Sequence, residues 1–123
     1  MVKGLGTVIY PVTDLNQAKA WYASAFQQQA YFDQPFYVGF NIAGYELGLV
    51  PSEAPLHQPG NRGVLAYWGV VNGDAAWKRI TDAGAKPLDA MKDVGDGIRV
   101  GVVADPYGNA IGLIENPHFK SKA

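Results

Sequence analysis

One order of predicted elements occurs twice along the 123 residues of this chain. Each half begins with a strand pattern, continues with a helix pattern and ends with three short strand patterns, giving the order βαβββ. A four-stranded sheet with a helix on one face leaves its other face to be covered. We therefore predict an α+β fold of two βαβββ modules, whose mixed sheets curl around a central cavity that serves as the ligand site. Chance repetition of short strand patterns is the alternative.

The first half carries the clearest helix signal. Residues 7–12 alternate as a strand with one face on a core. Asp14, with Gln17 three residues later, resembles a capping box. The apolar residues behind it recur at helical spacing, which predicts a helix over about 14–28. The segment 30–50 is rich in Tyr, Phe and Val and is interrupted twice by turn-forming residues, which predicts three short antiparallel strands.

The second half repeats this order after a connection rich in Pro and Gly. The segment 64–71 predicts a strand, and Asn72 to Asp74 begin a helix that ends at Gly84. Three more strand patterns follow, separated by the turn sequences GDG and DPYGN.

The length of the chain fits one compact domain over residues 1–123. With 48% hydrophobic residues, the chain should bury roughly two-thirds of its unfolded surface. This is enough for a core without a metal or disulfides. We place module one at about 1–50, the linker at 51–63, module two at about 64–116 and a frayed tail at 117–123.

The composition disfavours several classes of partner. Ten basic and eleven acidic residues give a formal charge of −1, so the chain lacks the positive surface that nucleic acids and anionic membranes require. This balance does not suit a cationic drug such as bleomycin either. No apolar run approaches the roughly 20 residues of a membrane span, and the first residues read as a strand and not as a signal peptide. The absence of cysteine favours the cytoplasm.

Three segments resemble the vicinal oxygen chelate superfamily, which includes glyoxalase, bleomycin-resistance proteins, fosfomycin-resistance enzymes and extradiol dioxygenases. They are TVIYPVTDLNQAKAWYASAF at 7–26, VLAYWGVVNGDAAWKRITDAGAKPL at 64–88 and, above all, ADPYGNAIGLIE at 104–115. The resemblance implies the paired βαβββ fold and a homodimer. It also implies four inward positions, usually His, Gln or Glu, that can hold a divalent metal.

Those four positions fall in this sequence on Thr7, Gly48, Leu65 and Gly112. Gly and Leu offer no donor atom and Thr is a weak one, whereas a divalent first-row ion prefers imidazole or carboxylate ligands. The two histidines, His57 and His118, lie in the linker and the tail. We therefore expect no metal and no other cofactor. Metal-dependent catalysis is disfavoured because it needs a Lewis acid.

Strand alternation selects the candidate ligand-binding residues. The face that would line the cavity carries Thr7, Ile9, Glu46, Gly48, Leu65, Tyr67 and Gly112. Tyr37 is a candidate for the mouth, although alternation does not show which face is concave there. Tyr67 would stack on a planar ligand or pack as a cross-strand aromatic residue. Arg99 would enter the cavity as an anion anchor or reach solvent at an edge. The two glycines would clear volume for a ligand or let the sheets approach closely.

These residues lead to a first hypothesis of a metal-free protein that, like bleomycin-resistance proteins, binds a small apolar or aromatic compound in a cavity between the modules. The alternative is a lyase, isomerase or dioxygenase of the same superfamily, with or without a divalent metal, in which Tyr67, Arg99 or Glu46 acts as acid, base or anchor. A third hypothesis is an interaction module with a filled core. No nucleophilic triad or phosphate-binding loop is present, so we name no catalytic residue.

Overall fold

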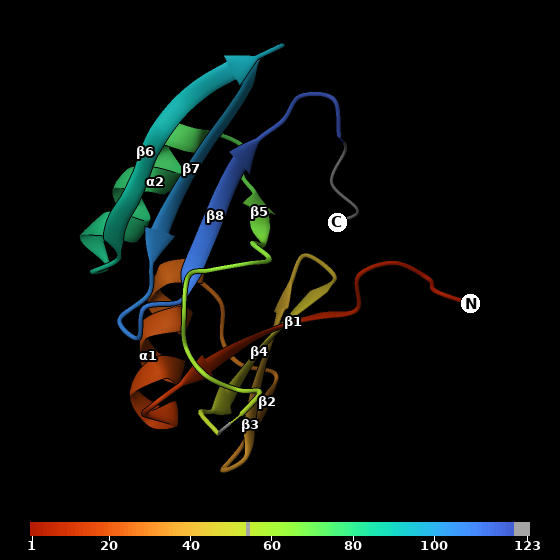
Figure 1. The fold of residues 1–123 in the computed structure, drawn as a ribbon, viewed down its shortest axis with the longest axis vertical. Helices are drawn as coiled ribbons and strands as arrows, with labels where there is room; N and C mark the ends of the chain where they lie inside the picture. The colour runs from red at the N-terminus through yellow and green to blue at the C-terminus, as the bar shows by residue number, and fades with distance from the viewer. Residues whose placement is uncertain (54, 120–123) are drawn as a thin grey trace. The chain divides into compact units, whose positions relative to one another are not determined.

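The computed structural model describes residues 1–53 and 55–119. Its elements follow the order β1-α1-β2-β3-β4 and then β5-α2-β6-β7-β8 (Figure 1). The predicted repeat of βαβββ is therefore confirmed. The chain divides after Pro59 into two compact units. Within the described residues, no helix has the length and apolar character needed to cross a membrane. The end of the predicted tail, 120–123, lies outside the described residues.

The first unit is a four-stranded mixed sheet with one helix. Its elements are β1 (Thr7–Val12), α1 (Leu15–Phe26), β2 (Phe32–Gln34), β3 (Tyr37–Ile42) and β4 (Tyr45–Pro51). The strand order is β1-β4-β3-β2, with β1 parallel to β4 and the other pairs antiparallel. Helix α1 begins as predicted, because the Asp14 side chain accepts a hydrogen bond from the Gln17 backbone N–H at 3.0 Å.

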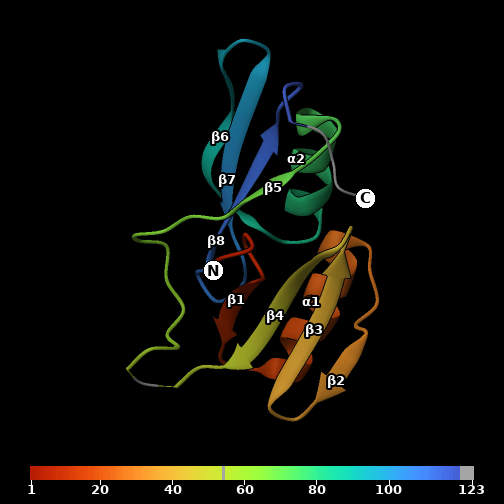
Figure 2. The same cartoon turned by 90° about the vertical axis from the view of Figure 1, so that its right-hand side faces the viewer.

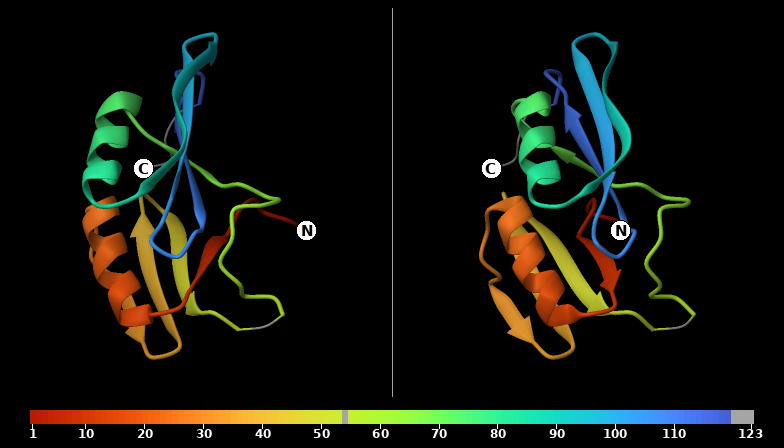
Figure 3. Two further views of the ribbon diagram at one scale, coloured as in Figure 1. Left: turned by 60° about the vertical axis from the view of Figure 1, so that its left-hand side comes forward. Right: turned by 90° about the vertical axis from the view of Figure 1, so that its left-hand side faces the viewer.

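Helix α1 covers one face of this sheet and packs against β3 and β4 (Figure 3). Tyr22 is fully buried at the centre of this contact, with its ring 5.5 Å from Tyr10 and 5.7 Å from Phe26. The sheet contributes the buried apolar side chains Tyr10, Val12, Val38, Phe40, Leu47 and Leu49. Burying each large apolar side chain contributes about 1.5–3 kcal/mol. The core of the unit therefore lies between α1 and the sheet.

The second unit repeats the arrangement with β5 (Tyr67–Gly69), α2 (Gly73–Asp82), β6 (Lys86–Gly95), β7 (Ile98–Ala104) and β8 (Ala110–Glu115). The strand order is β5-β8-β7-β6, and α2 covers one face of the sheet (Figure 2). Strand β5 is shorter than the segment 64–71 predicted from the sequence. Its ladder with β8 spans three residue pairs, and the flanking Val64 and Val71 are exposed.

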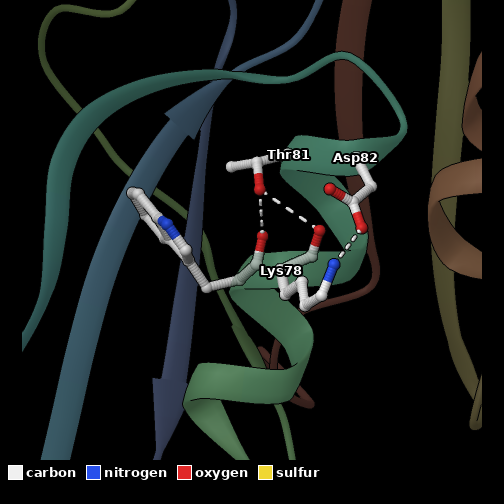
Figure 4. Close-up of polar contacts among 4 residues, drawn as sticks. Lys78, Thr81 and Asp82 are labelled. Carbon is white, nitrogen blue, oxygen red and sulfur yellow. Dashed lines mark hydrogen bonds and ion pairs between the residues drawn. The ribbon is translucent and has the colours of Figure 1, made fainter.

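Helix α2 is capped by Asn72, whose side chain accepts from the Ala75 backbone N–H at 3.0 Å. In the last turn Lys78 pairs with Asp82 at 2.8 Å, and the Thr81 hydroxyl donates to the carbonyl of Lys78 at 3.2 Å (Figure 4). Both charged side chains are mostly exposed, so water screens their attraction and the pair contributes little to stability. Burial of Ile80 against the sheet therefore holds the helix more strongly than its ion pair.

The DPYGN turn between β7 and β8 is built around a buried carboxylate. Asp105 Oδ1 accepts from the backbone N–H groups of Tyr107 and Asn109, at 2.8 and 2.9 Å. Its Oδ2 accepts from Asn109 Nδ2 at 2.9 Å, and both side chains are 4% exposed. The carboxylate supplies an internal acceptor for the donors of the turn, which is a structural role.

Candidate functional site

The face of the first sheet opposite α1, which we call the open face, gathers five of the predicted ligand-binding residues. Successive strand residues point to opposite faces, so the residues between the core positions of β1, β3 and β4 point away from α1. The pairing register sets Thr7 beside Glu46 and Ile9 beside Gly48. The open face carries Thr7, Ile9, Tyr37, Gly39, Asn41, Glu46 and Gly48.

Glu46 is the acceptor at the centre of the open face. Its Oε1 accepts a hydrogen bond from Thr7 Oγ1 at 2.7 Å, and its Oε2 accepts one from the Tyr31 hydroxyl. The hydrogen bonds from Tyr31, Thr7 and Tyr37, in that order of size against an opposing effect of burial, lower the pKa of Glu46 below its ordinary value of 4.5. Glu46 is therefore an anion at neutral pH.

The charge of Glu46 is met by hydroxyl groups and not by a cation. Residues 1–59 contain two lysines, Lys3 and Lys19, and no arginine. Lys19 Nζ lies 2.8 Å from Asp33 Oδ2. Among the described residues, no Lys, Arg or His nitrogen lies within ion-pair distance of Glu46. A neutral donor stabilises a carboxylate but leaves its net charge in place.

Two tyrosine side chains cover the glycines of the open face. Gly39 and Gly48 are partners across β3 and β4. A Cβ on Gly48 would lie 2.7 Å from Tyr37 Cζ, and a Cβ on Gly39 would lie 3.0 Å from Tyr31 Cε1. The glycines thus allow both rings to approach the sheet. Burial, followed by the hydrogen bond to Glu46, raises the pKa of Tyr37 to about 12.

Further aromatic side chains surround this arrangement. Phe32 makes edge-on contacts with Tyr37 and Phe36, with ring centroids 6.0 and 6.2 Å apart. Tyr31 and Phe36 are 62% and 66% exposed, and Phe32 is 38% exposed. We call Tyr31, Phe32, Phe36 and Tyr37 the aromatic cluster. Exposed aromatic side chains grouped in this way mark a binding surface more often than a core.

In the second unit the structure places Tyr67 over Gly112. The two are register partners, and a Cβ on Gly112 would lie 2.6 Å from Tyr67 Cδ1 and 2.8 Å from the Ala66 carbonyl oxygen. Tyr67 is 44% exposed, so one side of its ring is open to solvent. Leu65 is half-buried and precedes β5.

Arg99 lies on the other face of the second sheet, which α2 covers. Its Nη2 donates to Asp74 Oδ1 at 2.7 Å in the first turn of α2. Its neighbour across β7 and β8, Glu115, accepts from the Gly73 backbone N–H at 2.6 Å. The structure therefore joins Arg99 to the start of α2 and does not bring it to Tyr67.

The donor set of the open face does not fit a divalent ion. The described residues contain no group of three or more His, Cys, Asp or Glu side chains that could hold a metal. At Gly48 and Gly112, the space that a ligating side chain would occupy is taken by the rings of Tyr37 and Tyr67. Glu46 alone supplies a carboxylate on the open face, whereas a metal site needs several ligands.

The fold and this site define the class of protein. The family model described as "Glyoxalase/Bleomycin resistance protein/Dioxygenase superfamily" matches residues 4–113. The chain therefore belongs to this superfamily, as the three sequence segments predicted. A comparison with curated proteins finds no match.

Solved structures share the fold at low sequence identity. A glyoxalase-related enzyme from Fulvimarina pelagi has a TM-score of 0.78 at 18% identity, covering 94% of this chain and 90% of that one. A superfamily member from Sphaerobacter thermophilus has 0.78 at 19%, covering 94% and 98%. The fosfomycin resistance protein FosX from Listeria monocytogenes has 0.78 at 17%, covering 96% and 97%. These likenesses confirm the predicted fold class.

Sequence reasoning missed three members of the aromatic cluster: Tyr31, Phe32 and Phe36. Tyr31 lies before β2, where its backbone N–H donates to the Gly39 carbonyl at 2.9 Å. The available signal was the pair of glycines in neighbouring strands, since a glycine inside a strand often marks close approach of another group.

Proposed function

We propose that the chain binds a small apolar or aromatic compound on the open face of the first sheet, without a metal ion. The observation that carries this proposal is the aromatic cluster, three of whose members are exposed and whose Tyr31 donates a hydrogen bond to the ionised Glu46. Aromatic side chains offer a planar ligand stacking partners. Glu46 and the hydroxyls bonded to it supply the few polar groups that would orient the ligand. For the second unit by itself, the ring of Tyr67 over Gly112 is a further candidate stacking surface.

Binding is favoured over acid–base catalysis by the lowered pKa of Glu46. A general base works best with a pKa near the operating pH, and enzymes raise a glutamate pKa to about 6–7 for this task. The hydroxyl donors around Glu46 move its pKa in the opposite direction. Glu46 is therefore a weak base, better suited to holding a ligand than to removing a proton. This argues against the lyase and isomerase alternatives that use Glu46 as a base.

The proposal includes no metal ion because of the residues that occupy the implied metal-ligand positions. Gly48 and Gly112 carry no donor, and tyrosine rings fill the space beside them. A single carboxylate and neutral hydroxyls are a poor donor set for a divalent first-row ion. Dioxygenase chemistry that requires such an ion is disfavoured for the same reason.

The test is a titration with benzyl alcohol, benzylammonium and indole, followed by amide NMR. We expect at least one probe to shift the Gly39 and Gly48 amides and to raise the melting temperature. A ligand at 100 times its dissociation constant adds about 2.7 kcal/mol of stability. Phe36→Ala should weaken binding, whereas Leu56→Ala, which truncates an exposed side chain after β4, should not. Absence of binding by all three probes at millimolar concentration would contradict the proposal.

A further inference from the structure

We infer that the open face of the first sheet selects ligands that carry an organic cation, such as a primary or quaternary ammonium group, which contacts Glu46 and the exposed ring of Tyr31. This inference rests on the proposed function and adds the charge of the ligand. Its basis is a carboxylate without a cationic partner inside an exposed aromatic cluster.

The local charge of residues 1–59 is more negative than the whole chain suggests. The acidic residues of 1–59 are Asp14, Asp33, Glu46 and Glu53, against two lysines, so this part of the sequence has a formal charge of 2 − 4 = −2. Residues 60–123 hold the remaining eight basic and seven acidic residues, a formal charge of 8 − 7 = +1. The near balance of the full sequence therefore conceals a more negative stretch over residues 1–59, which is complementary to a cationic ligand.

The groups around Glu46 suit a cation. The Tyr31 ring lies close to Gly39, and its hydroxyl donates to Glu46 Oε2. Tyr31 is 62% exposed, so the ring is accessible from solvent next to the carboxylate. A cation over an aromatic ring is attracted by the ring's quadrupole, and a nearby carboxylate adds a direct charge interaction. Both attractions act at the same place.

The hydrogen-bonding pattern favours a bulky cation over a metal ion. Thr7 and Tyr31 already donate to separate oxygens of Glu46, so an incoming group does not have to supply donors for the carboxylate. An alkylammonium group interacts through charge and contact with ring faces. A small metal ion would have to displace these hydroxyl donors and would find too few ligands.

Two isosteric probes separate this inference from the proposed function. Benzylammonium and benzyl alcohol have the same ring and similar size but differ in charge. We expect calorimetry or amide NMR at pH 7 to give benzylammonium at least tenfold tighter binding than benzyl alcohol. Glu46→Gln should remove this difference, and added salt should reduce it. Glu53→Gln, the same change at an exposed residue beyond β4, is the matched control and should preserve it.

Equal affinity for the two probes, or a difference that survives Glu46→Gln, would overturn the inference while leaving the proposed function intact. If neither probe nor indole binds, the proposed function fails and the inference with it. Amide spectra of each variant show whether it remains folded. Tyr31→Leu, which keeps Glu46 but removes the ring, should also reduce the preference for the cation.

Discussion

The ring of Tyr37 lies over Gly48, where its Cζ is 2.7 Å from the position that a Cβ on the glycine would take. The glycine therefore has a packing role, which is to admit this ring. In the family's metal-binding proteins this position is expected to hold a ligand. At this position the chain has a glycine under a tyrosine ring in place of the implied metal ligand. The packing of the first sheet therefore supports the proposal of binding without a metal ion.

Gly48→Ala should destabilise the protein by about 1–3 kcal/mol, the usual cost of forcing an extra methyl group into a packed place. Urea unfolding measures this effect. The three atoms nearest to the new methyl are side-chain atoms of Tyr37 and Ile9, so Tyr37→Ala should relieve much of the cost in a double-mutant cycle. Gly69→Ala is the matched control, because nothing lies within 4 Å of its Cβ position. Equal costs at the two glycines would contradict the packing role.

Gly112→Ala should behave differently. Its new methyl would meet the Ala66 carbonyl oxygen at 2.8 Å as well as the Tyr67 ring, and a backbone oxygen cannot rotate away. We expect Tyr67→Ala to rescue less of the lost stability here than Tyr37→Ala rescues in Gly48→Ala. Full rescue in urea unfolding would show that the tyrosine ring alone sets the requirement for glycine.

The stability contribution of Glu46 should depend on pH. Because its folded pKa is lowered from 4.5, the contribution is fully present above about 4.5 and is lost as the pH falls through the folded value. The difference in unfolding free energy between the wild type and Glu46→Gln should shrink over this acid range. Carbon NMR titration should show the pKa of Glu46 rising toward 4.5 in Tyr31→Phe. An unchanged pKa would mean that the Tyr31 hydroxyl does not hold the carboxylate.

Tyr37 should show the opposite behaviour at high pH. Its pKa is raised from 10.0 to about 12, so the neutral phenol contributes stability that is fully present below pH 10 and lost as the pH rises through 12. Absorbance titration near 295 nm should contain a late-titrating tyrosine that disappears in Tyr37→Phe. Tyr45→Phe serves as the comparison and should leave the late step in place.

Asp105→Ala should be among the more destabilising single substitutions. It removes the acceptor for two backbone N–H groups and for Asn109 Nδ2 in the DPYGN turn. Each buried donor left unpaired costs about 1–3 kcal/mol, so we expect a total loss of about 3 kcal/mol or more in urea unfolding. Asp82→Ala, which removes an exposed carboxylate at the end of α2, is the control. A loss below 1 kcal/mol for Asp105→Ala would contradict the structural role of the turn.

Much of the fold was predictable because it is encoded locally. Asp14 and Asn72 cap their helices through contacts three residues away, and alternation along β1 and β4 correctly separated Thr7 and Glu46 from the buried side chains. Tyr31 was not predictable in this way. It lies outside the strands, where a hydrogen bond from its backbone N–H to the Gly39 carbonyl fixes its position. From there its hydroxyl reaches Glu46. No periodic pattern in the sequence indicates such a contact.

Arg99 and the overall charge show two further limits of sequence reasoning. Alternation set Arg99 apart from Val100 and Val102, but its actual partner, Asp74, depends on where α2 packs. The formal charge of −1 argued against a cationic ligand, yet an average over the chain carries no information about one carboxylate without an ionic partner. In both cases the side chain's surroundings are set by residues that are distant in sequence.

Calorimetric titration of indole into protein stripped of metal by a chelator, with elemental analysis of the same sample, tests the central claim most directly. We predict that the dissociation constant is the same before and after stripping, with no stoichiometric ion in either sample. Loss of indole binding after stripping, restored by one equivalent of zinc, nickel, manganese or iron per chain, would contradict the account.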